Sequence, residues 1–304
     1  MLIGAHVSTA GGLVKAHARG VERGCEAIQV FNQSPRMWRP TRWKPDDIAA
    51  FRELMSDGPI GSVVIHAVYL INCASKEPEI REKSLNSLLH SLLLGDAIGA
   101  DGVVVHPGYQ KGEPLEESLV RIGEALVHVL GESERCPLLL ENTAGMTGTV
   151  GRSFAELADL IDRAGGDERL GICVDCCHLF ASGYDVRTAD GLAEVVEECV
   201  TAIGRERLRC LHVNDSRIPF GGNRDQHANL PEGEMGREAL AAFLSEPRFE
   251  GLPALLEVPG QDKHGPDAGQ VAIAKELREE GLAARGSRGG RTRRRRQAAR
   301  RSPG

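Results

Sequence analysis

Eight short apolar runs recur along the chain, and longer segments with helical spacing separate them. The runs are rich in Val, Ile and Leu and are mostly continuous rather than alternating with polar residues. This pattern is typical of strands in a parallel sheet that is covered on both faces. The predicted strands lie within residues 2–8, 27–32, 62–67, 102–108, 137–145, 170–178, 208–216 and 253–260.

Between the strands, apolar residues spaced three and four apart predict helices. Ser153 is expected to cap one of them, and Glu156, three residues later, completes a capping box. The predicted helices cover residues 12–24, 46–56, 79–98, 115–130, 154–161, 189–203, 236–245 and 267–282.

Eight strands alternating with eight helices predict an α/β fold, a single (β/α)8 TIM barrel with its active site at the C-terminal ends of the strands. A doubly wound open sheet is the structural alternative. The first strand is followed by neither a phosphate loop nor a dinucleotide glycine fingerprint, since Ala10-Gly11-Gly12 is too short to count as either. We therefore expect no organic cofactor.

The last 22 residues differ in kind from the rest. Residues 283–304 contain nine arginines, no acid and few apolar side chains. This composition predicts a disordered basic tail, so we divide the chain into a barrel domain, residues 1–282, and a tail, residues 283–304. The tail either assists nonspecific nucleic-acid binding or is dispensable, and the sequence leaves both possibilities open.

The charge of the barrel domain constrains its partners. The net charge of the whole chain is −6, so residues 1–282 carry −15. Such an acidic domain needs bound cations to present a face that attracts a polyanion. The chain has no stretch of 18 apolar residues and no signal-peptide pattern, which predicts a cytoplasmic protein without a membrane partner.

The eight cysteines show no spacing typical of a disulfide framework, so we expect them to be reduced and buried. Cys173-x-x-Cys176 is the one pattern that suggests a metal site. If this stretch is a strand, its two thiols face opposite sides of the sheet and cannot share an ion.

Histidines and acids follow the apolar runs at the predicted C-terminal ends of the strands. A barrel of this kind would bring these side chains to one mouth. Imidazole and carboxylate together suit zinc, manganese or iron. The candidate ligands are His66, His106, Glu141, Asp175, His178, His212 and Glu257, with Asp225 and His227 in the loop after the seventh run.

A single histidine after an apolar run is more often a core residue than a ligand. Four acids beside five histidines are a different case, because buried carboxylates are costly without cations. Three divalent ions would outweigh four carboxylates, so the acidic domain could still bind phosphate at this mouth. Two ions about 3.5–4 Å apart would suit hydrolysis of a phosphodiester.

Several stretches around these residues resemble one known family. In chain order they are Gly4-Ala5-His6-Val7-Ser8, His66-Ala67-Val68-Tyr69-Leu70-Ile71-Asn72, His106-Pro107-Gly108, Leu140-Glu141-Asn142-Thr143-Ala144-Gly145, Val174-Asp175-Cys176-Cys177-His178, Gly183-Tyr184-Asp185, His212-Val213-Asn214-Asp215-Ser216, Arg224-Asp225-Gln226-His227 and Leu256-Glu257-Val258-Pro259-Gly260. The chain is similar here to bacterial endonuclease IV, the metal-dependent apurinic/apyrimidinic endonucleases of base-excision repair.

The resemblance implies a site with three zinc ions. Its carboxylates Glu141, Asp175 and Glu257 would be catalytic as well as metal-binding. Carried over to the matching positions, the three ions would be held by His66, His106 and Glu141; by Glu141, Asp175, His212 and Glu257; and by His178, Asp225 and His227.

The reaction that the resemblance implies is hydrolysis of the phosphodiester 5′ to an abasic site in duplex DNA. The products would be a 3′-hydroxyl and a 5′-deoxyribose phosphate, and the same site would trim blocked 3′ ends. The partner would be duplex DNA that contains these lesions. We expect a monomer in the cytoplasm, associated with the nucleoid.

Recognition in this family uses side chains pushed into the duplex, and extrusion costs least where the base is already missing. Tyr69 and Leu70 match the inserted positions, and Arg36 is the expected third, with Arg39 as the alternative. Without the resemblance, Tyr69 and Leu70 would be interpreted as loop residues packed on the barrel. Gln226 stands where a basic residue is common, and Pro231 replaces a glycine.

Two other functions are weighed against this one. The first is a metal-dependent sugar isomerase or epimerase on the same barrel, although such sites depend more on carboxylates than on five histidines. The second is a noncatalytic DNA-binding protein that uses its basic tail. An intact set of nine ligands speaks against the second.

Overall fold

Eight parallel strands close into a barrel, which confirms the predicted TIM-barrel fold. The computed structural model describes residues 1–299. Around the barrel the strands follow the order β1-β12-β9-β8-β6-β4-β3-β2. They are β1 (Leu2–His6), β2 (Ala27–Phe31), β3 (Ser62–His66), β4 (Gly102–Val105), β6 (Leu138–Glu141), β8 (Leu170–Asp175), β9 (Leu208–His212) and β12 (Pro253–Leu256). Each lies within one of the eight apolar runs.

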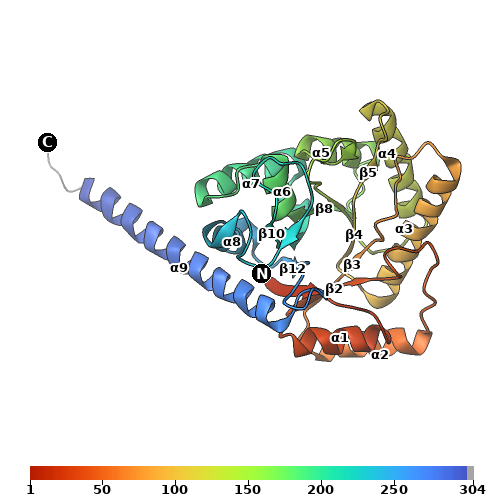
Figure 1. The fold of residues 1–304 in the computed structure, drawn as a ribbon, viewed down its shortest axis with the longest axis horizontal. Helices are drawn as coiled ribbons and strands as arrows, with labels where there is room; N and C mark the ends of the chain where they lie inside the picture. Colours follow the sequence, from red (N-terminus) through yellow and green to blue (C-terminus); the bar gives the residue numbers. More distant parts are fainter. Residues whose placement is uncertain (300–304) are drawn as a thin grey trace.

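Helices surround the strands and cover their outer faces (Figure 1). They are α1 (Leu13–Glu22), α2 (Pro45–Asp57), α3 (Pro78–Ile98), α4 (Leu115–Gly131), α5 (Phe154–Arg163), α6 (Cys176–Ser182), α7 (Ala189–Ile203), α8 (Gly236–Leu244) and α9 (Ala268–Ala299), with 3-10 turns η1 (Arg205–Arg207) and η2 (Pro247–Phe249). Two antiparallel pairs lie outside the barrel: β5 (Gly108–Tyr109) with β7 (Thr149–Val150), and β10 (Asp215–Ser216) with β11 (His227–Ala228).

The predicted cap of α5 forms, but only half of the capping box does. The Ser153 hydroxyl accepts a hydrogen bond from the backbone N–H of Glu156 at 3.2 Å. The Glu156 carboxylate, however, accepts from the N–H groups of Gly151 and Arg152 rather than from that of Ser153. The carboxylate therefore anchors the approach to the helix as well as its first turn.

The run at residues 170–178 is not strand throughout, as the helix α6 begins inside it. β8 ends at Asp175, whose carboxylate accepts a hydrogen bond from the N–H of His178 at 2.8 Å and so caps α6. The chain thus passes from strand to helix without a loop. This places His178 in the first turn of the helix, directly above the strand end.

Two apolar clusters hold the barrel together, one inside it and one between strands and helices. The inner cluster consists of Ala27, Val64, Val104, Leu139, Cys173, Cys210 and Leu255, all fully buried. Side chains alternate along a strand, so neighbouring residues belong to the outer cluster. This explains why the runs are continuous in hydrophobicity.

The cysteines are free and buried, as expected. Cys173 belongs to the inner cluster, whereas Cys176 begins α6 and packs in the outer cluster. The two thiols therefore lie on different sides of the barrel wall. Burial raises the pKa of both thiols, which favours packing over metal binding.

The helix α9 continues into the segment expected to be a disordered tail. It passes through residue 282 without a break and includes residues 283–299, while residues 300–304 lie outside the described residues. Figure 1 shows its C-terminal part extending away from the barrel. Alanine and arginine are strong helix formers, which allows the helix to run on. Among the described residues, no helix is long and apolar enough to cross a membrane.

We predict that Gly4→Ala destabilises the barrel. A Cβ at Gly4 in β1 would overlap the backbone oxygen of Ala27 in the neighbouring β2, and backbone cannot move aside cheaply. We expect a loss of about 1–3 kcal/mol or more in the free energy of unfolding, measured in urea. Gly131→Ala, at the end of α4 with open space around it, is the control and should change stability by less than about 1 kcal/mol. Equal stability of the two variants would contradict the prediction.

Candidate metal centre

A ring of polar side chains lies above the inner cluster, toward the C-terminal ends of the strands. Each member lies two residues after an inner-cluster residue or, for His6, after Gly4, so its side chain faces the barrel interior. The members of this polar ring are His6, Gln29, His66, His106, Glu141, Asp175, His212 and Glu257.

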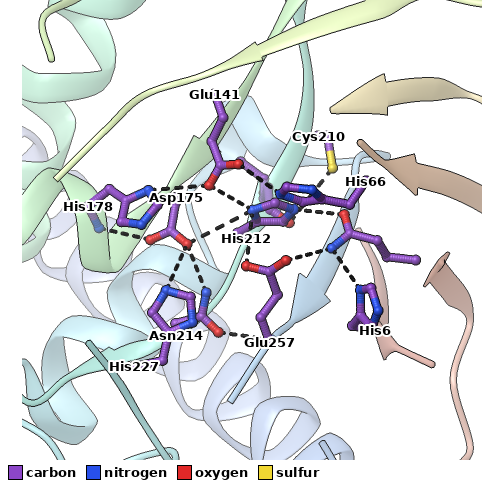
Figure 2. Close-up of polar contacts among 12 residues, drawn as sticks. His6, His66, Glu141, Asp175, His178, Cys210, His212, Asn214, His227 and Glu257 are labelled. Carbon is purple, nitrogen blue, oxygen red and sulfur yellow. Dashed lines mark hydrogen bonds and ion pairs between the residues drawn. The ribbon is translucent and has the colours of Figure 1, made fainter. Parts of the chain in front are cut away.

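All nine residues that the sequence singles out as ligands lie in three groups. Within each group, one potential ligand atom from every residue lies within 4.8 Å of the others. The groups are His66, His106 and Glu141; Glu141, Asp175, His212 and Glu257; and His178, Asp225 and His227. We call them the first, the shared and the third group. Glu141 belongs to the first two, and Figure 2 shows it between the histidines.

The third group is assembled by segments outside the barrel strands. His178 comes from α6 and His227 from β11, while Asp225 lies in the preceding loop. Asp225 Oδ2 is 3.3 Å from His178 Nε2, and its Oδ1 is 3.1 Å from His227 Nε2. The Asp225 side chain is 42% exposed, so this group opens to solvent.

Backbone carbonyls determine which nitrogen of two histidines faces the groups. His66 Nδ1 donates to the Ala67 carbonyl at 2.6 Å, and His178 Nδ1 donates to the Asn142 carbonyl at 2.9 Å. A carbonyl oxygen can only accept, so both Nδ1 atoms carry hydrogen. The Nε2 atoms are then unprotonated in the neutral rings and available to a cation.

The donor atoms fit a divalent transition metal. Among the described residues, the buried atoms Glu141 Oε2, His178 Nε2 and His227 Nε2 have no hydrogen-bond partner. Buried polar atoms rarely stay unsatisfied, and each of these three points into one of the groups. Imidazole nitrogen combined with carboxylate oxygen is a donor set that zinc accepts.

Two further clusters of potential ligands contain cysteine: Cys173, Cys210 and His212; and Asp175, Cys177 and His227. Burial raises the pKa of the Cys173 and Cys177 thiols, with Asp175 adding to the shift at Cys177. A neutral thiol is a weak ligand, so these sulfur atoms act as packing beneath the site.

Without metal, the negative charge of the carboxylates and the positive charge of protonated imidazoles stabilise each other. Burial opposes charge on His178 and His212, but Asp175 beside the former and Glu257 beside the latter raise their pKa well above the ordinary value. Burial likewise disfavours the charged form of Glu141, yet His212 and His106 hold its pKa well below normal. Burial is also outweighed at His227, whose pKa rises to about 9 beside Asp225.

Two buried amides that were not predicted from the sequence hold candidate ligands in place. Asn214 Nδ2 donates to Asp175 Oδ2 at 2.8 Å, and its Oδ1 accepts from the N–H of Glu257 at 2.8 Å. Asn142 Oδ1 accepts from the N–H of Asp175 at 2.7 Å. Each asparagine lies within two residues of a ligand, a position that could have drawn attention to both.

The residues expected to contact DNA lie at the rim. Tyr69 is 58% exposed, and its ring centroid lies 5.3 Å from that of His66. Leu70 is half-buried and packs against the core, whereas Arg36 and Arg39 are exposed in the loop after β2. Their roles stay predictions.

Of the two noted departures from the family, Gln226 is exposed beside the third group. Pro231 is half-buried and follows a cis peptide bond.

We predict that the metal-free protein loses stability as the pH rises from about 6.5 to about 9. The folded-state pKa of His227 is raised, so its proton stabilises the folded state fully below pH 6.5, and this contribution is lost by about pH 9. Thermal unfolding of the chelated protein across this range measures it. His227→Gln should flatten the profile, and an unchanged slope in that variant would contradict the assignment.

Comparisons with known proteins agree with this geometry. A family model described as a xylose isomerase-like TIM barrel matches residues 18–281. A protein of Halothermothrix orenii named "Probable endonuclease 4" is 39% identical over 267 residues, which cover 86% of this chain and 96% of that protein. The structure of endonuclease IV from Thermus thermophilus superposes with a TM-score of 0.81 at 36% identity, covering 92% of this chain and all of that one. A D-tagatose 3-epimerase-like protein, 20% identical with a TM-score of 0.69, covers 95% of this chain and 99% of its own, and shares the fold. On these matches, the chain belongs to the endonuclease IV family of DNA-repair nucleases.

Proposed function

We propose that this protein is a zinc-dependent apurinic/apyrimidinic endonuclease. It hydrolyses the phosphodiester 5′ to an abasic site in duplex DNA, leaving a 3′-hydroxyl and a 5′-deoxyribose phosphate, and it trims blocked 3′ ends. The observation that carries the proposal is the set of three ligand groups at one barrel mouth, two of which share Glu141. Family membership supports the choice of DNA as substrate.

Three zinc ions per chain are proposed, one for each group. When bound, such ions lower the pKa of a water molecule and neutralise charge on the phosphate and on the departing oxygen. The protein's part is to hold its donor atoms at short, constant separations. Glu141 and Asp175 are fully buried, so their carboxylates cannot turn out to bind water instead of the ions.

Glu257 is the third catalytic carboxylate of the proposal. Its side chain is 11% exposed, so it is the acid of the shared group that meets the mouth. Its Oε2 lies 3.4 Å from His212 Nδ1. From this position it can orient a water that approaches the phosphate, which supports its catalytic assignment.

Tyr69, Leu70 and Arg36 are proposed to enter the duplex and fill the space of the extruded nucleotide. An exposed aromatic ring next to the ligands can stack on the neighbouring base pair once the sugar enters the mouth. Extruding a nucleotide costs least at an abasic position, so insertion of these side chains favours that lesion over intact DNA. Arg39, in the same loop, is the alternative to Arg36.

The acidic composition of the barrel domain agrees with this proposal. Four carboxylates facing three divalent ions leave a positive excess where the phosphate binds. We expect the protein to act as a monomer in the cytoplasm, at the nucleoid. The division into a barrel domain, residues 1–282, and a tail, residues 283–304, belongs to the same proposal.

A duplex with one abasic site, labelled at the 5′ end of the damaged strand, tests this function. We expect a single nick ending in a 3′-hydroxyl, abolished by a strong chelator and restored by Zn²⁺. Glu141→Gln should lower the rate by at least about 10²–10³-fold, since it removes charge shared by two ions. Glu168→Gln, exposed before the start of β8, is the matched control and should cut normally.

Cleavage unaffected by chelators would overturn the zinc mechanism. Turnover of a ketose–aldose pair without nicking would support the sugar isomerase instead. DNA binding without any cleavage would support the noncatalytic alternative.

We predict that Tyr69→Ala weakens binding of the abasic duplex without loss of zinc. One base–aromatic stack contributes about 1–3 kcal/mol, so the dissociation constant should rise by roughly 5–150-fold. Val127→Ala, another exposed apolar side chain on the outer face of α4, should bind as the wild type does. Fluorescence anisotropy with abasic and intact duplexes measures the affinity of both variants. If Tyr69→Ala binds the abasic duplex as tightly as the wild type does, Tyr69 is not inserted into the DNA.

A further inference from the structure

Two members of the polar ring belong to none of the three ligand groups. These are His6 at the end of β1 and Gln29 in β2, which lie side by side in the parallel register of the two strands. Gln29 is fully buried. A buried amide facing the barrel interior must find partners for its oxygen and its nitrogen, and its partners here are ligands.

Gln29 contacts two residues of the shared group at once. Its Nε2 donates to Glu257 Oε1 at 2.6 Å, and its Oε1 accepts from His212 Nε2 at 2.8 Å. Glu257 directly follows β12 and His212 ends β9, and these two strands are neighbours in the barrel. One amide thus joins two ligands that lie 45 positions apart in the sequence.

The hydrogen bond to His212 decides which ring nitrogen can bind metal. An amide oxygen only accepts, so His212 Nε2 carries hydrogen and Nδ1 is left free in the neutral ring. His212 Nδ1 is the atom that faces the other ligands, 3.0 Å from Glu141 Oε1 and 3.4 Å from Glu257 Oε2. In the other tautomer, hydrogen would stand between these carboxylates and any cation.

Because of the hydrogen bond from Gln29, the two carboxylate oxygens of Glu257 have different partners. Oε1 is occupied by Gln29, while Oε2 faces His212 Nδ1 and the centre of the shared group. Holding one oxygen fixes the rotation of the carboxylate, so the other oxygen keeps its direction.

Glu257 fixes the orientation of the Gln29 amide, and His6 takes its second N–H. The second N–H of Gln29 points at His6 Nδ1, 3.3 Å away. Burial, which outweighs the attraction of Glu257, lowers the pKa of His6 to about 4, so its ring is neutral and can accept at neutral pH. A reversed amide would set its oxygen against the Glu257 carboxylate, acceptor against acceptor, and is excluded.

We propose that Gln29 is a positioning residue of the shared group, holding His212 in the tautomer that offers Nδ1 and turning Glu257 Oε2 toward the same ion. His6 supports it by accepting the second N–H of the amide. This inference rests on the proposed function in one respect, that the shared group holds zinc. Gln29 lies in β2, a strand with no residue in any of the three groups.

The test compares Gln29→Met, Gln29→Glu and the wild type, loaded with Zn²⁺. Methionine keeps the length of the side chain but can neither donate nor accept as the amide does. Loss of a residue that orients ligands typically weakens metal binding by about 10–100-fold. In Gln29→Met, we expect one of the three zinc ions to be removed by a competing chelator at a concentration about 10–100-fold lower than the wild type requires.

Gln33→Met is the matched control. Gln33 is also buried, but it donates to the backbone oxygen of Met37 and touches no ligand. It should retain all three ions with wild-type affinity. His178→Ala, in the third group, should instead lose an ion without changing the affinity of the other two, which identifies the site emptied by each variant.

A second measurement separates positioning from mere packing. The ¹⁵N resonances of the His212 ring report which nitrogen carries hydrogen, and the wild type should show hydrogen at Nε2. Gln29→Glu keeps an acceptor for that hydrogen but sets a second carboxyl against that of Glu257, so it should preserve the tautomer while still weakening zinc binding. Gln29→Met should lose both. Circular dichroism verifies that each variant is folded.

Gln29→Met with three zinc ions at wild-type affinity and an unchanged His212 tautomer would overturn the inference alone. If Gln29→Met is too unstable to purify, the His212 tautomer in Gln29→Glu and in the wild type becomes the deciding measurement. Hydrogen at His212 Nδ1 of the wild type would also overturn the inference. A wild-type protein that binds no zinc would overturn the proposed function and this inference together.

Discussion

The buried carboxylate of Glu141 is the constraint on which the site depends. It has no exposed surface, and four imidazole nitrogens lie 3.0–3.4 Å from its oxygens, those of His66, His106, His178 and His212. Removing a carboxylate from water is costly unless positive charge replaces the lost hydration. In the metal-free protein, His106, His178 and His212 supply positive charge, because the neighbouring carboxylates raise the pKa of their rings. In the proposed function, bound zinc ions would supply positive charge beside the same carboxylate.

The barrel meets this constraint because its geometry is rigid. The apolar inner cluster occupies one level of the interior, and the polar ring follows two residues later on every strand. Asp175 then connects the ring to the third group, since Oδ1 caps α6 through the His178 N–H while Oδ2 accepts from Asn214. A shift of this strand end would move ligands of two groups together. Buried amides take part at each step. Asn142 holds the backbone of Asp175, Asn214 holds its carboxylate, and Gln29 bonds to His212 and Glu257.

The strands and the barrel could be predicted from local sequence, and so could the nine residues that the structure gathers into possible metal-binding groups. Continuous apolar runs indicate buried parallel strands, and an acid or histidine at the end of such a run is costly without a cation. The family resemblance then divides the nine into three sets, and the structure brings these sets together in space. The start of α6 directly after Asp175 was not predicted, because nothing in hydrophobicity distinguishes the first turn of this helix from the strand before it. Helix in residues 283–299 was also unexpected, since composition suggested disorder while local helix propensity and the preceding turns of α9 favoured its continuation.

The sequence by itself determined which residues are available for metal chemistry and which apolar run each one ends or follows. Only the tertiary structure decided how their atoms are directed. Whether His212 offers Nδ1 or Nε2, and which oxygen of Glu257 faces inward, depends on Gln29, which lies 183 residues before the first and 228 before the second. In the sequence, Gln29 looks like an ordinary polar residue within an apolar run. Contacts of this range arise from barrel closure and leave no local periodicity, so the positioning residues become visible only when the strands stand side by side.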